Sequence, residues 1–252
     1  MQSKNKTVMR SMEILNLFIH HAKLSFNEIV EHSGIPKTSA YRMVQTLEEM
    51  DLLDKDANGH YSLGVLFLRF GHLVSERMDI RQLAIPAMEK LHKETGQAIN
   101  LIIRDRDEAV YIEKIQSIQP VRLYTMIGRR TPLYAGACAR VILSFLPAQQ
   151  REEYLKRVEL VPFAKGTIAT IEDLRQSISQ TRNVGYTISY SELEDFTAAI
   201  AFPILDYKGD IIAGISIAGI EKDYEGEALE HFITLGKQSA SEISAKLGYI
   251  ES

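Results

Sequence analysis

Residues 24–53 read LSFNEIVEHSGIPKTSAYRMVQTLEEMDLL, and they carry the pattern of two short helices separated by a glycine. Ser25 is a residue type that caps a helix N-terminus, and Gly34 can turn the chain without steric cost. Pro36 suits the first turn of a second helix, where its missing N–H is no loss. The stretch therefore predicts a helix-turn-helix, and the rest of the chain is organised around it.

The second helix of this stretch has one apolar face and one polar face. Its apolar residues recur at i, i+3, i+4 and i+7, and they are Ala40, Met43, Val44 and Leu47. The polar residues left for the open face are Lys37, Thr38, Ser39, Tyr41, Arg42 and Gln45. Lysine, arginine and hydroxyl groups bind phosphates, while arginine also reads guanine edges and glutamine reads adenine edges. We therefore predict that this helix enters the major groove of duplex DNA.

The composition sets the class of protein. A chain of 252 residues has room for two domains or one large one. Its 45% hydrophobic and 25% charged residues are typical of a folded soluble protein, which argues against disorder. A single cysteine, Cys138, excludes an internal disulfide framework and fits a reducing cytoplasm. Because the sequence has no apolar run of about 18 residues, we expect a cytoplasmic protein without a membrane partner.

The net charge of -4 argues mildly against a nucleic-acid partner. Residues 1–64 do not change this balance, because they hold seven basic and eight acidic residues. Four of the seven basic residues, however, fall in the N-terminal arm and on the proposed recognition helix. The DNA hypothesis therefore depends on where the charges are placed, and a dimer would double the local positive surface.

Two elements flank the helix-turn-helix. Residues 7–21 predict a helix that packs behind it through Val8, Met12, Leu15 and Ile19, with Ile14, Leu17 and Phe18 widening the apolar stripe. A hairpin is predicted around Asn58-Gly59, because that dipeptide tolerates the positive φ that both positions of a tight turn need. Three helices followed by a hairpin make a winged helix-turn-helix.

The tip of the predicted wing holds two further candidates for contact with DNA. His60 and Tyr61 follow the turn directly and could reach the DNA backbone or the minor groove. The alternative, in which they only decorate a hairpin, is equally compatible with the sequence.

The order of these segments resembles a known family. VMRSMEILNLF, the stretch at 24–53 and GHYSLGVLFLRFG are similar to the N-terminal module of the IclR family of bacterial transcription regulators. The similarity continues through TGQAINLIIRDRDEAVYIEKI, GRRTPLYAGACARVILSFL and FPILDYKGDIIAGISIAGI. It covers nearly the whole chain, and it implies an N-terminal winged helix-turn-helix over residues 1–64 followed by a GAF-like effector-binding domain.

Residues 65–78, VLFLRFGHLVSERM, predict an apolar helix between the two domains. Such a helix exposes much apolar surface when alone, so we expect it to bury that surface against a second copy of the chain. The resemblance implies the same, because IclR proteins assemble as dimers or tetramers through a linker helix. A two-fold dimer requires a roughly palindromic operator.

Residues 79–252 predict an α+β domain with a mainly antiparallel sheet. Asp79 can cap its first helix, which Pro86 should break or kink and Gly96 should end. Strands are predicted at 98–105, 109–115 and 121–127, and again at 185–190, 198–206 and 211–220. Helices are predicted at 136–146, 148–158 and 225–247, and another runs from a capping box at Thr170 and Asp173 to Gly185.

The sequence holds no motif typical of an enzyme. It lacks a G-x-G-x-x-G loop, a Walker loop, an H-E-x-x-H pair and a C-x-x-C pair. Ser216 lies in GISIA, which is close to a nucleophile elbow, but the stretch is an apolar strand. Cys138 begins a helix without an identifiable base. We therefore expect no catalytic residue, metal or cofactor.

A ligand pocket is predicted at the turn YAGACAR, residues 134–140, which presents backbone N–H groups at a helix start. The resemblance implies that an effector binds the amides of Ala137 and Cys138. It adds four positions on the later strands, which are Ser189, Ala199, Ser216 and Ala218. The chain departs from the family by having Ala139-Arg140 where Gly-Lys is frequent, and Ser189 where some members are acidic. With alanines at the two further positions 199 and 218, the pocket is predicted to be less polar than one for a very small organic acid. Plain sheet packing remains the alternative for Ser189, Ala199 and Ala218.

Together these features favour a ligand-responsive transcription regulator, most simply a repressor, whose partners are operator DNA, a small effector such as an organic acid, and a second copy of the chain. One alternative is a small-molecule enzyme or carrier with a helical appendage. Another is a protein-interaction module, because winged helices also bind proteins. Steep salt dependence of duplex binding would distinguish the regulator from the interaction module.

Overall fold

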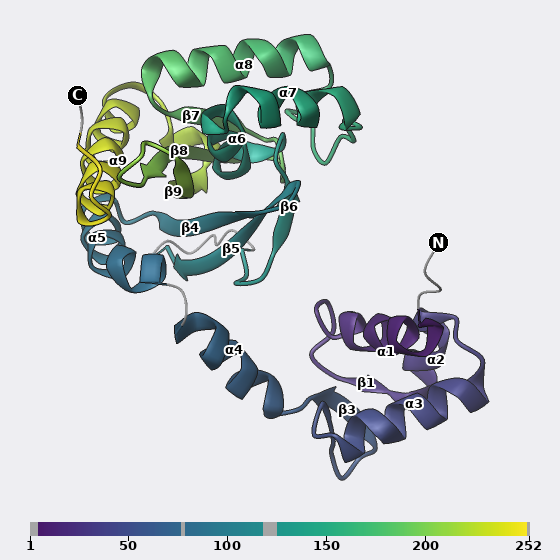
Figure 1. Cartoon of the computed structure of the whole chain (residues 1–252). Helices are drawn as coiled ribbons and strands as arrows, with labels where there is room; N and C mark the ends of the chain where they lie inside the picture. The colour runs from purple at the N-terminus through teal and green to yellow at the C-terminus, as the bar shows by residue number, and fades with distance from the viewer. Residues whose placement is uncertain (1–4, 77–78, 118–124, 251–252) are drawn as a thin grey trace. The chain divides into compact units, whose positions relative to one another are not determined.

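The computed structural model describes residues 5–76, 79–117 and 125–250. The chain divides into two compact units, residues 1–77 and 78–252, whose elements are labelled in Figure 1. No helix among the described residues is long and apolar enough to cross a membrane.

The N-terminal unit holds four helices and three short strands. In chain order they are α1 (Lys6–Leu17), β1 (Leu24–Ser25), α2 (Phe26–Ser33), α3 (Lys37–Glu49), β2 (Leu53–Lys55), β3 (His60–Leu63) and α4 (Leu66–Glu76). Ser25 caps α2 in a capping box with Glu28, and Gly34 ends it with φ 64°. Pro36 is the residue before the first turn of α3, so the helix itself begins at Lys37. The strands form a sheet of order β1-β3-β2, in which β1 is a strand that the sequence did not predict.

The face that α1 buries is only one part of the predicted apolar stripe. The core of this unit takes Ile14, Leu15 and Phe18, whereas Val8, Met12 and Ile19 are 58%, 48% and 49% exposed. The sequence of α1 is apolar on more than one side, so its periodicity alone did not select the buried face.

The wing turn also differs from the expected tight turn. Four residues, 56–59, join β2 to β3, and of the predicted turn pair Asn58-Gly59 only Gly59 has a positive φ, 80°. The Asp56 carboxylate completes the turn by accepting from the backbone N–H groups of Asn58 and His60, both at 3.0 Å. Tyr61 is 4% exposed and belongs to the core, so the interpretation of this residue as a wing-tip contact was wrong.

The C-terminal unit is built on one six-stranded sheet of order β6-β5-β4-β9-β8-β7, in which every neighbouring pair is antiparallel. Its strands are β4 (Ala98–Asp105), β5 (Glu108–Ile115), β6 (Arg130–Pro132), β7 (Thr187–Tyr190), β8 (Thr197–Leu205) and β9 (Ile211–Ile220). Its helices are α5 (Asp79–Thr95), α6 (Gly136–Phe145), α7 (Ala148–Arg157), α8 (Ile171–Val184), α9 (Gly226–Lys246) and the short 3-10 turn η1 (Glu221–Asp223).

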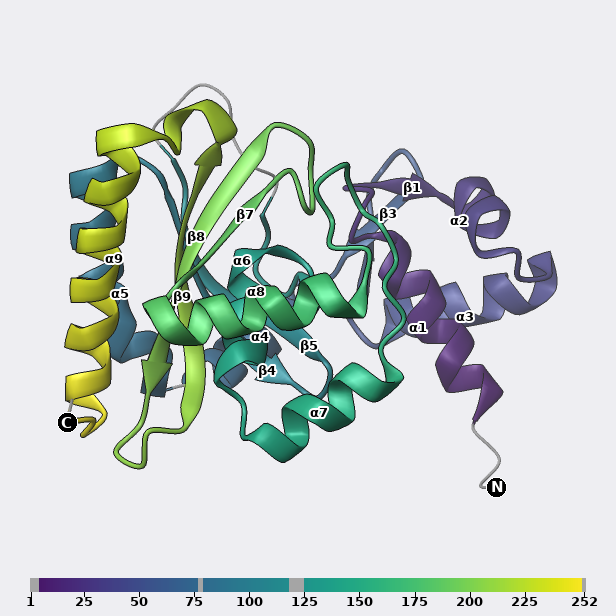
Figure 2. The same ribbon diagram turned by 90° about the horizontal axis from the view of Figure 1, so that it is seen from above.

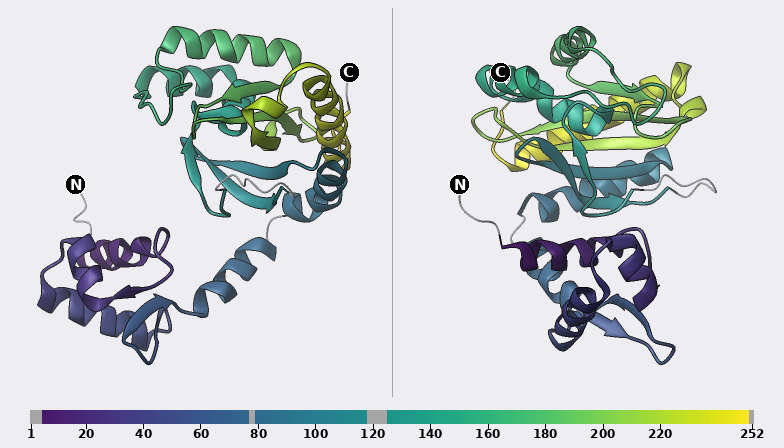
Figure 3. Two further views of the ribbon diagram at one scale, coloured as in Figure 1. Left: turned by 180° about the vertical axis from the view of Figure 1, so that it is seen from behind. Right: turned by 90° about the vertical axis from the view of Figure 1, so that its right-hand side faces the viewer.

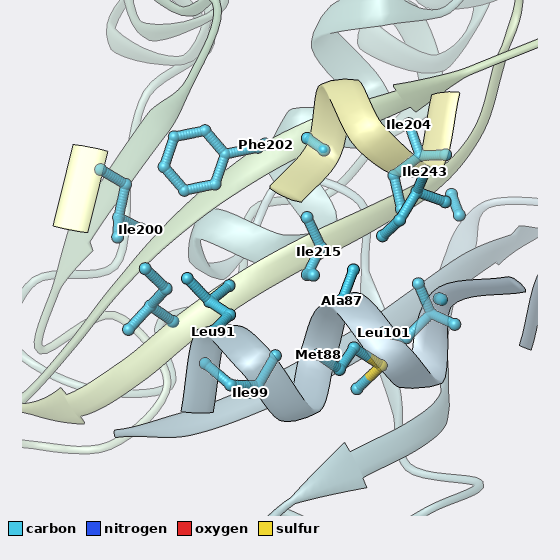
Figure 4. Close-up of a cluster of buried hydrophobic side chains, with 14 of the residues drawn as sticks. Ala87, Met88, Leu91, Ile99, Leu101, Ile200, Phe202, Ile204, Ile215 and Ile243 are labelled. Atoms are coloured by element: carbon cyan, nitrogen blue, oxygen red, sulfur yellow. The ribbon is translucent and has the colours of Figure 1, made fainter. Parts of the chain in front are cut away.

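Helices cover both faces of this sheet, as Figure 2 and the two views of Figure 3 show. Successive residues of β8 alternate between the faces, as a pleated strand requires. Phe202 points to the cluster shared with α5 and α9, whereas Ala201 belongs to the cluster shared with α6, α7 and α8. Figure 4 shows the first cluster, with Met88 and Leu91 of α5 near Ile99 and Leu101 of β4. The second cluster lies beside the predicted ligand pocket.

Three local predictions for this unit need correction. The helix α5 is not broken at Pro86 and continues to Thr95; the proline is exposed, whereas Ala84 and Met88 on the opposite side of the helix are buried. That helix already begins at Asp79, which is therefore inside it rather than its cap. For the strand predicted at 121–127, residues 121–124 lie outside the described residues and residues 125–127 form no strand. The edge strand is instead β6, three residues further on, where the chain pairs with β5.

Candidate nucleic-acid interface and ligand pocket

The helix α3 presents the polar face that its sequence predicted. Ala40, Val44 and Leu47 are 0%, 1% and 5% exposed, so they fix which side of the helix meets the core. The opposite side is open to solvent through Lys37, Thr38, Tyr41, Arg42 and Gln45, while Ser39 is half-buried. Five of the six predicted contacts on α3 are therefore exposed together on one helix.

Two side-chain contacts hold part of this face in place. The ring of Tyr41 packs edge-on against Phe26 of α2, with ring centres 5.8 Å apart. The Gln45 amide donates to the Tyr41 hydroxyl at 2.8 Å. By contrast, none of the ion pairs formed by the described residues includes Lys37 or Arg42. The face thus combines a positioned Tyr–Gln pair with two cations that are available to an anionic partner.

His60 lies on a different element from the other predicted DNA contacts. It begins β3 and is half-buried, and its backbone N–H donates to Asp56. The hydrogen bond from Lys23 is the main reason why the pKa of Asp56 falls to about 2. Asp56 therefore stays ionised at neutral pH and holds both the wing turn and Lys23, at 2.8 Å.

A small cavity of ≈ 50 Å³ lies in the C-terminal unit at the first turn of α6. Five of the six predicted effector-binding residues line it, and they are Ala137, Cys138, Ser189, Ala199 and Ala218. The sixth, Ser216, is fully buried behind Cys138 and accepts a hydrogen bond from its thiol at 2.8 Å. The structure thus brings all six positions to one place, although residues from three strands and a helix contribute them.

The same cavity is lined by polar residues that the sequence did not single out, namely Asn100, Tyr111, Thr125, Arg129, Glu192, Glu194 and Thr197. Asn100 is the one polar residue among the first six of the strand AINLIIRD, and this exception was a signal that could have identified it. The two glutamates come from the irregular segment between β7 and β8, where no periodicity marks their direction. Their position beside α6 could not be predicted from spacing in the sequence, because the order of the strands in the sheet determines it.

Two ion pairs neutralise the charged groups around the cavity. Glu192, 6% exposed, accepts from Arg140 at 2.5 Å and from the backbone N–H of Gly136 at 2.9 Å. Glu194 pairs with Arg129 at 3.0 Å. Arg140, which replaces the lysine frequent in the family, is 2% exposed and does not line the cavity. Its role in this chain is to hold Glu192 beside the start of α6.

The groups that face the cavity are suited to hydrogen bonding rather than to covalent chemistry. Burial raises the pKa of the Cys138 thiol and that of the Tyr111 hydroxyl, so both stay protonated at neutral pH. A protonated thiol is a weak nucleophile. The buried Oδ1 of Asn100 has no hydrogen-bond partner among the described residues, and the first N–H groups of a helix have none within the helix. The start of α6 therefore offers backbone N–H donors to a small molecule in the cavity.

A winged helix-turn-helix joined to a sheet domain with a small cavity defines a DNA-binding transcriptional regulator. Residues 7–57 match the IclR helix-turn-helix domain, and residues 72–245 match the bacterial transcriptional regulator IclR C-terminal domain. The chain belongs to the IclR family, whose members are transcriptional regulators and not enzymes. The predicted family and the predicted α+β two-domain fold are confirmed.

Relatives resemble the chain over nearly its whole length. It is 53% identical over 249 residues to the HTH-type transcriptional regulator KipR of Bacillus subtilis, covering 99% of this chain and 100% of KipR. The crystal structure of the Thermotoga maritima IclR has a TM-score of 0.82 at 32% identity, over 96% of this chain and 99% of that one. An IclR homolog from Microbacterium hydrocarbonoxydans, complexed with 4-hydroxybenzoate, has a TM-score of 0.82 over 96% of this chain and 99% of that one. Its 21% identity shows likeness of fold alone.

Proposed function

We propose that the chain is an effector-responsive repressor that acts in the cytoplasm and binds a palindromic operator as a dimer or a tetramer. Residues 1–64 bind DNA, residues 65–78 join two copies, and residues 79–252 bind the effector. The observation that carries this proposal is the exposed polar face of α3, which presents the side-chain types that bind base edges in the major groove. An effector acts by binding the DNA-competent and DNA-incompetent arrangements unequally.

Arg42 provides the direct test of DNA reading. It is exposed at the middle of α3 and has no ion-pair partner among the described residues. If it contacts a base edge with two hydrogen bonds, Arg42→Ala weakens operator binding by about 1–3 kcal/mol. The measurement is a fluorescence anisotropy titration with a duplex from the chain's own promoter region. Unchanged affinity in that titration would remove Arg42 from the recognition surface.

The proposal of a dimer rests on the apolar side of α4 and the residue before it. Val65, Leu68, Phe70 and Leu73 are 71%, 75%, 50% and 43% exposed, whereas Phe67 packs against the N-terminal core. Exposed apolar surface of this kind is typical of an interface. We expect Leu68→Glu to shift sedimentation velocity profiles toward the monomer, and an unchanged profile would place the interface elsewhere.

The effector proposal rests on the cavity beside α6. An organic acid fits it, because the backbone N–H groups of Ala137 and Cys138 can donate to a carboxylate. The 4-hydroxybenzoate complex of the structural relative supports this class of ligand. Enlarging the half-buried Ala199 to Leu should fill the cavity, so small carboxylates should no longer raise the melting temperature. Operator binding without ligand should remain as in the wild-type protein, which separates loss of the pocket from loss of the fold.

A further inference from the structure

A second concave surface lies in the N-terminal unit, between α1 and α3. It is a groove of ≈ 450 Å³, and its lining residues are Lys6, Thr7, Arg10, Ser11, Thr38, Ser39, Arg42, Met43 and Thr46. We call it the α1–α3 groove. Only Arg42, Thr38 and Ser39 belong to the DNA contacts predicted from the sequence, so the α1 side of the groove has no role in the proposed reading of bases.

The lining of the α1–α3 groove is cationic and rich in hydroxyl groups. It holds three basic side chains and five hydroxyls, and it holds no carboxylate. This segregation is notable because residues 1–64 contain more acidic than basic residues, eight against seven. Lys6, Arg10 and Arg42 take part in none of the ion pairs formed by the described residues. Three cations that share one groove without a counter-charge favour an anion that comes from outside the chain.

The two cations on α1 do not serve the helix itself. Asn5 already caps it, by accepting from the N–H groups of Thr7 and Val8, and the first turn contains no acidic residue. Lys6, the first residue of α1, faces the positive end of the helix dipole, which disfavours a cation there. Lys6 and Arg10 are exposed, so they contribute little to packing. Their position is thus explained by an external anion better than by helix stability.

We propose that the α1–α3 groove holds one strand of the DNA sugar–phosphate backbone, with Lys6 and Arg10 pairing with phosphate oxygens. The inference rests on the proposed function, in which α3 lies in the major groove. A helix in the major groove has a phosphate strand along each side, and the α1 side of α3 carries the three cations of the groove. The hydroxyls of Thr7 and Ser11 add donors of the type that binds phosphates. Lys6 and Arg10 therefore position α3 without reading sequence.

The test compares full-length Arg10→Ala with wild-type protein on two duplexes, one from the chain's promoter region and one of unrelated sequence. Removing one charge-assisted hydrogen bond should weaken binding to both duplexes by about tenfold. The slope of log affinity against log salt concentration should fall by about 0.9, because one phosphate is no longer neutralised by the protein. Arg10→Lys, which keeps the charge, should restore most of the affinity.

Two controls isolate the pairing of Arg10 with phosphate. Lys156→Ala removes the same charge from an exposed position on α7 in the other unit, and it should leave affinity and salt slope unchanged. Replacing the phosphates that flank the half-site with neutral methylphosphonates should weaken the wild-type protein. The same duplex should abolish the difference between wild type and Arg10→Ala, because neither protein then has an anion to pair with at this position.

The outcomes separate this inference from the proposed function. If the wild-type protein prefers its promoter duplex and Arg10→Ala keeps both affinity and salt slope, the groove does not bind the backbone and the inference is overturned. It is equally overturned if Arg10→Ala weakens only the promoter duplex, because Arg10 then reads bases. If the wild-type protein binds neither duplex, the regulator proposal itself fails. Circular dichroism of each variant excludes a loss of α1 as the cause.

Discussion

The two candidate sites of this protein differ in how their charged groups are exposed to water. On α3 the polar groups stand in water, and Arg42 and Lys37 have no ion-pair partner among the described residues. Around the cavity the charged groups are partly or fully removed from water, and Glu192 and Glu194 are each paired with an arginine. An exposed charge needs no partner, whereas a buried charge is destabilising without one. The DNA face is therefore open to a polyanion, and the cavity is organised before a ligand arrives.

The difference has a consequence for mutation. Substitutions on the face of α3 should change binding and leave the fold intact. Substitutions of the buried charged groups beside the cavity should change the fold and the binding together, because Arg140 and Glu192 form a buried ion pair. Variants of the two kinds therefore test whether burial determines if a substitution affects stability as well as binding.

The largest effect is expected at the buried pair of Arg140 and Glu192. Glu192→Gln removes the negative charge and leaves Arg140 buried without a counter-ion. Breaking a buried pair in this way is destabilising by about 3–5 kcal/mol. Urea unfolding followed by far-ultraviolet circular dichroism would measure the change in the free energy of unfolding of the C-terminal unit.

The exposed pair of Arg175 and Glu152 provides the matched control. Two hydrogen bonds join these side chains, at 2.8 Å and 2.6 Å, and both are more than 40% exposed. Glu152→Gln should therefore lower the free energy of unfolding by less than about 1 kcal/mol. Equal effects of the two substitutions would show that burial does not distinguish the pairs, and the contrast between the sites would fail.

A second prediction concerns the packing between α9 and the sheet. A Cβ built at Gly236 would lie 1.9 Å from the Phe202 ring, so the core has no space for it. Although alanine is the better helix former, Gly236→Ala should destabilise the C-terminal unit by about 1–3 kcal/mol. Gly71 of α4 meets nothing within 4 Å, so Gly71→Ala should stabilise by up to about 1 kcal/mol. Thermal unfolding of both variants measures whether each melting temperature falls or rises. A Gly236→Ala protein as stable as wild type would contradict the close packing of Gly236 against Phe202.

These two regions also show how far the sequence leads. The buried face of α3 was predictable because local periodicity determines it, and the strands of the C-terminal unit other than β6 were predictable from their β-branched residues. The buried face of α1 was not predictable, since more than one of its faces is apolar and only tertiary packing selects Ile14. The pocket was found in part through the turn of Ala137, but Arg129 and Glu192 reach it through the order of the strands. Contacts that depend on the order of the strands in the sheet produce no regular spacing in the sequence from which they could be predicted.

A smaller effect is expected at the wing. The pKa of Asp56 is lowered from the ordinary 3.8 to about 2, mainly by the hydrogen bond from Lys23. A carboxyl with a lowered pKa stabilises the fold above its unfolded pKa, and this contribution is lost as the pH falls through the folded pKa. Asp56→Asn should therefore lower the melting temperature slightly at pH 5–7. The difference from wild type should vanish as the pH falls from about 4 to about 2, and a difference independent of pH would exclude the charge as its cause.

The smallest effect on stability is expected on the DNA face itself. Gln45 is exposed, and its one side-chain hydrogen bond, to Tyr41, joins two surface groups. Gln45→Ala should change the free energy of unfolding by less than about 0.5 kcal/mol. If Gln45 reads an adenine edge, the same substitution should reduce discrimination against a changed base pair by about 1–3 kcal/mol. Unfolding curves together with anisotropy titrations on matched and mismatched duplexes measure both quantities on one protein. A large loss of stability with unchanged discrimination would reverse the assignment, because Gln45 would then belong to the fold and not to the interface.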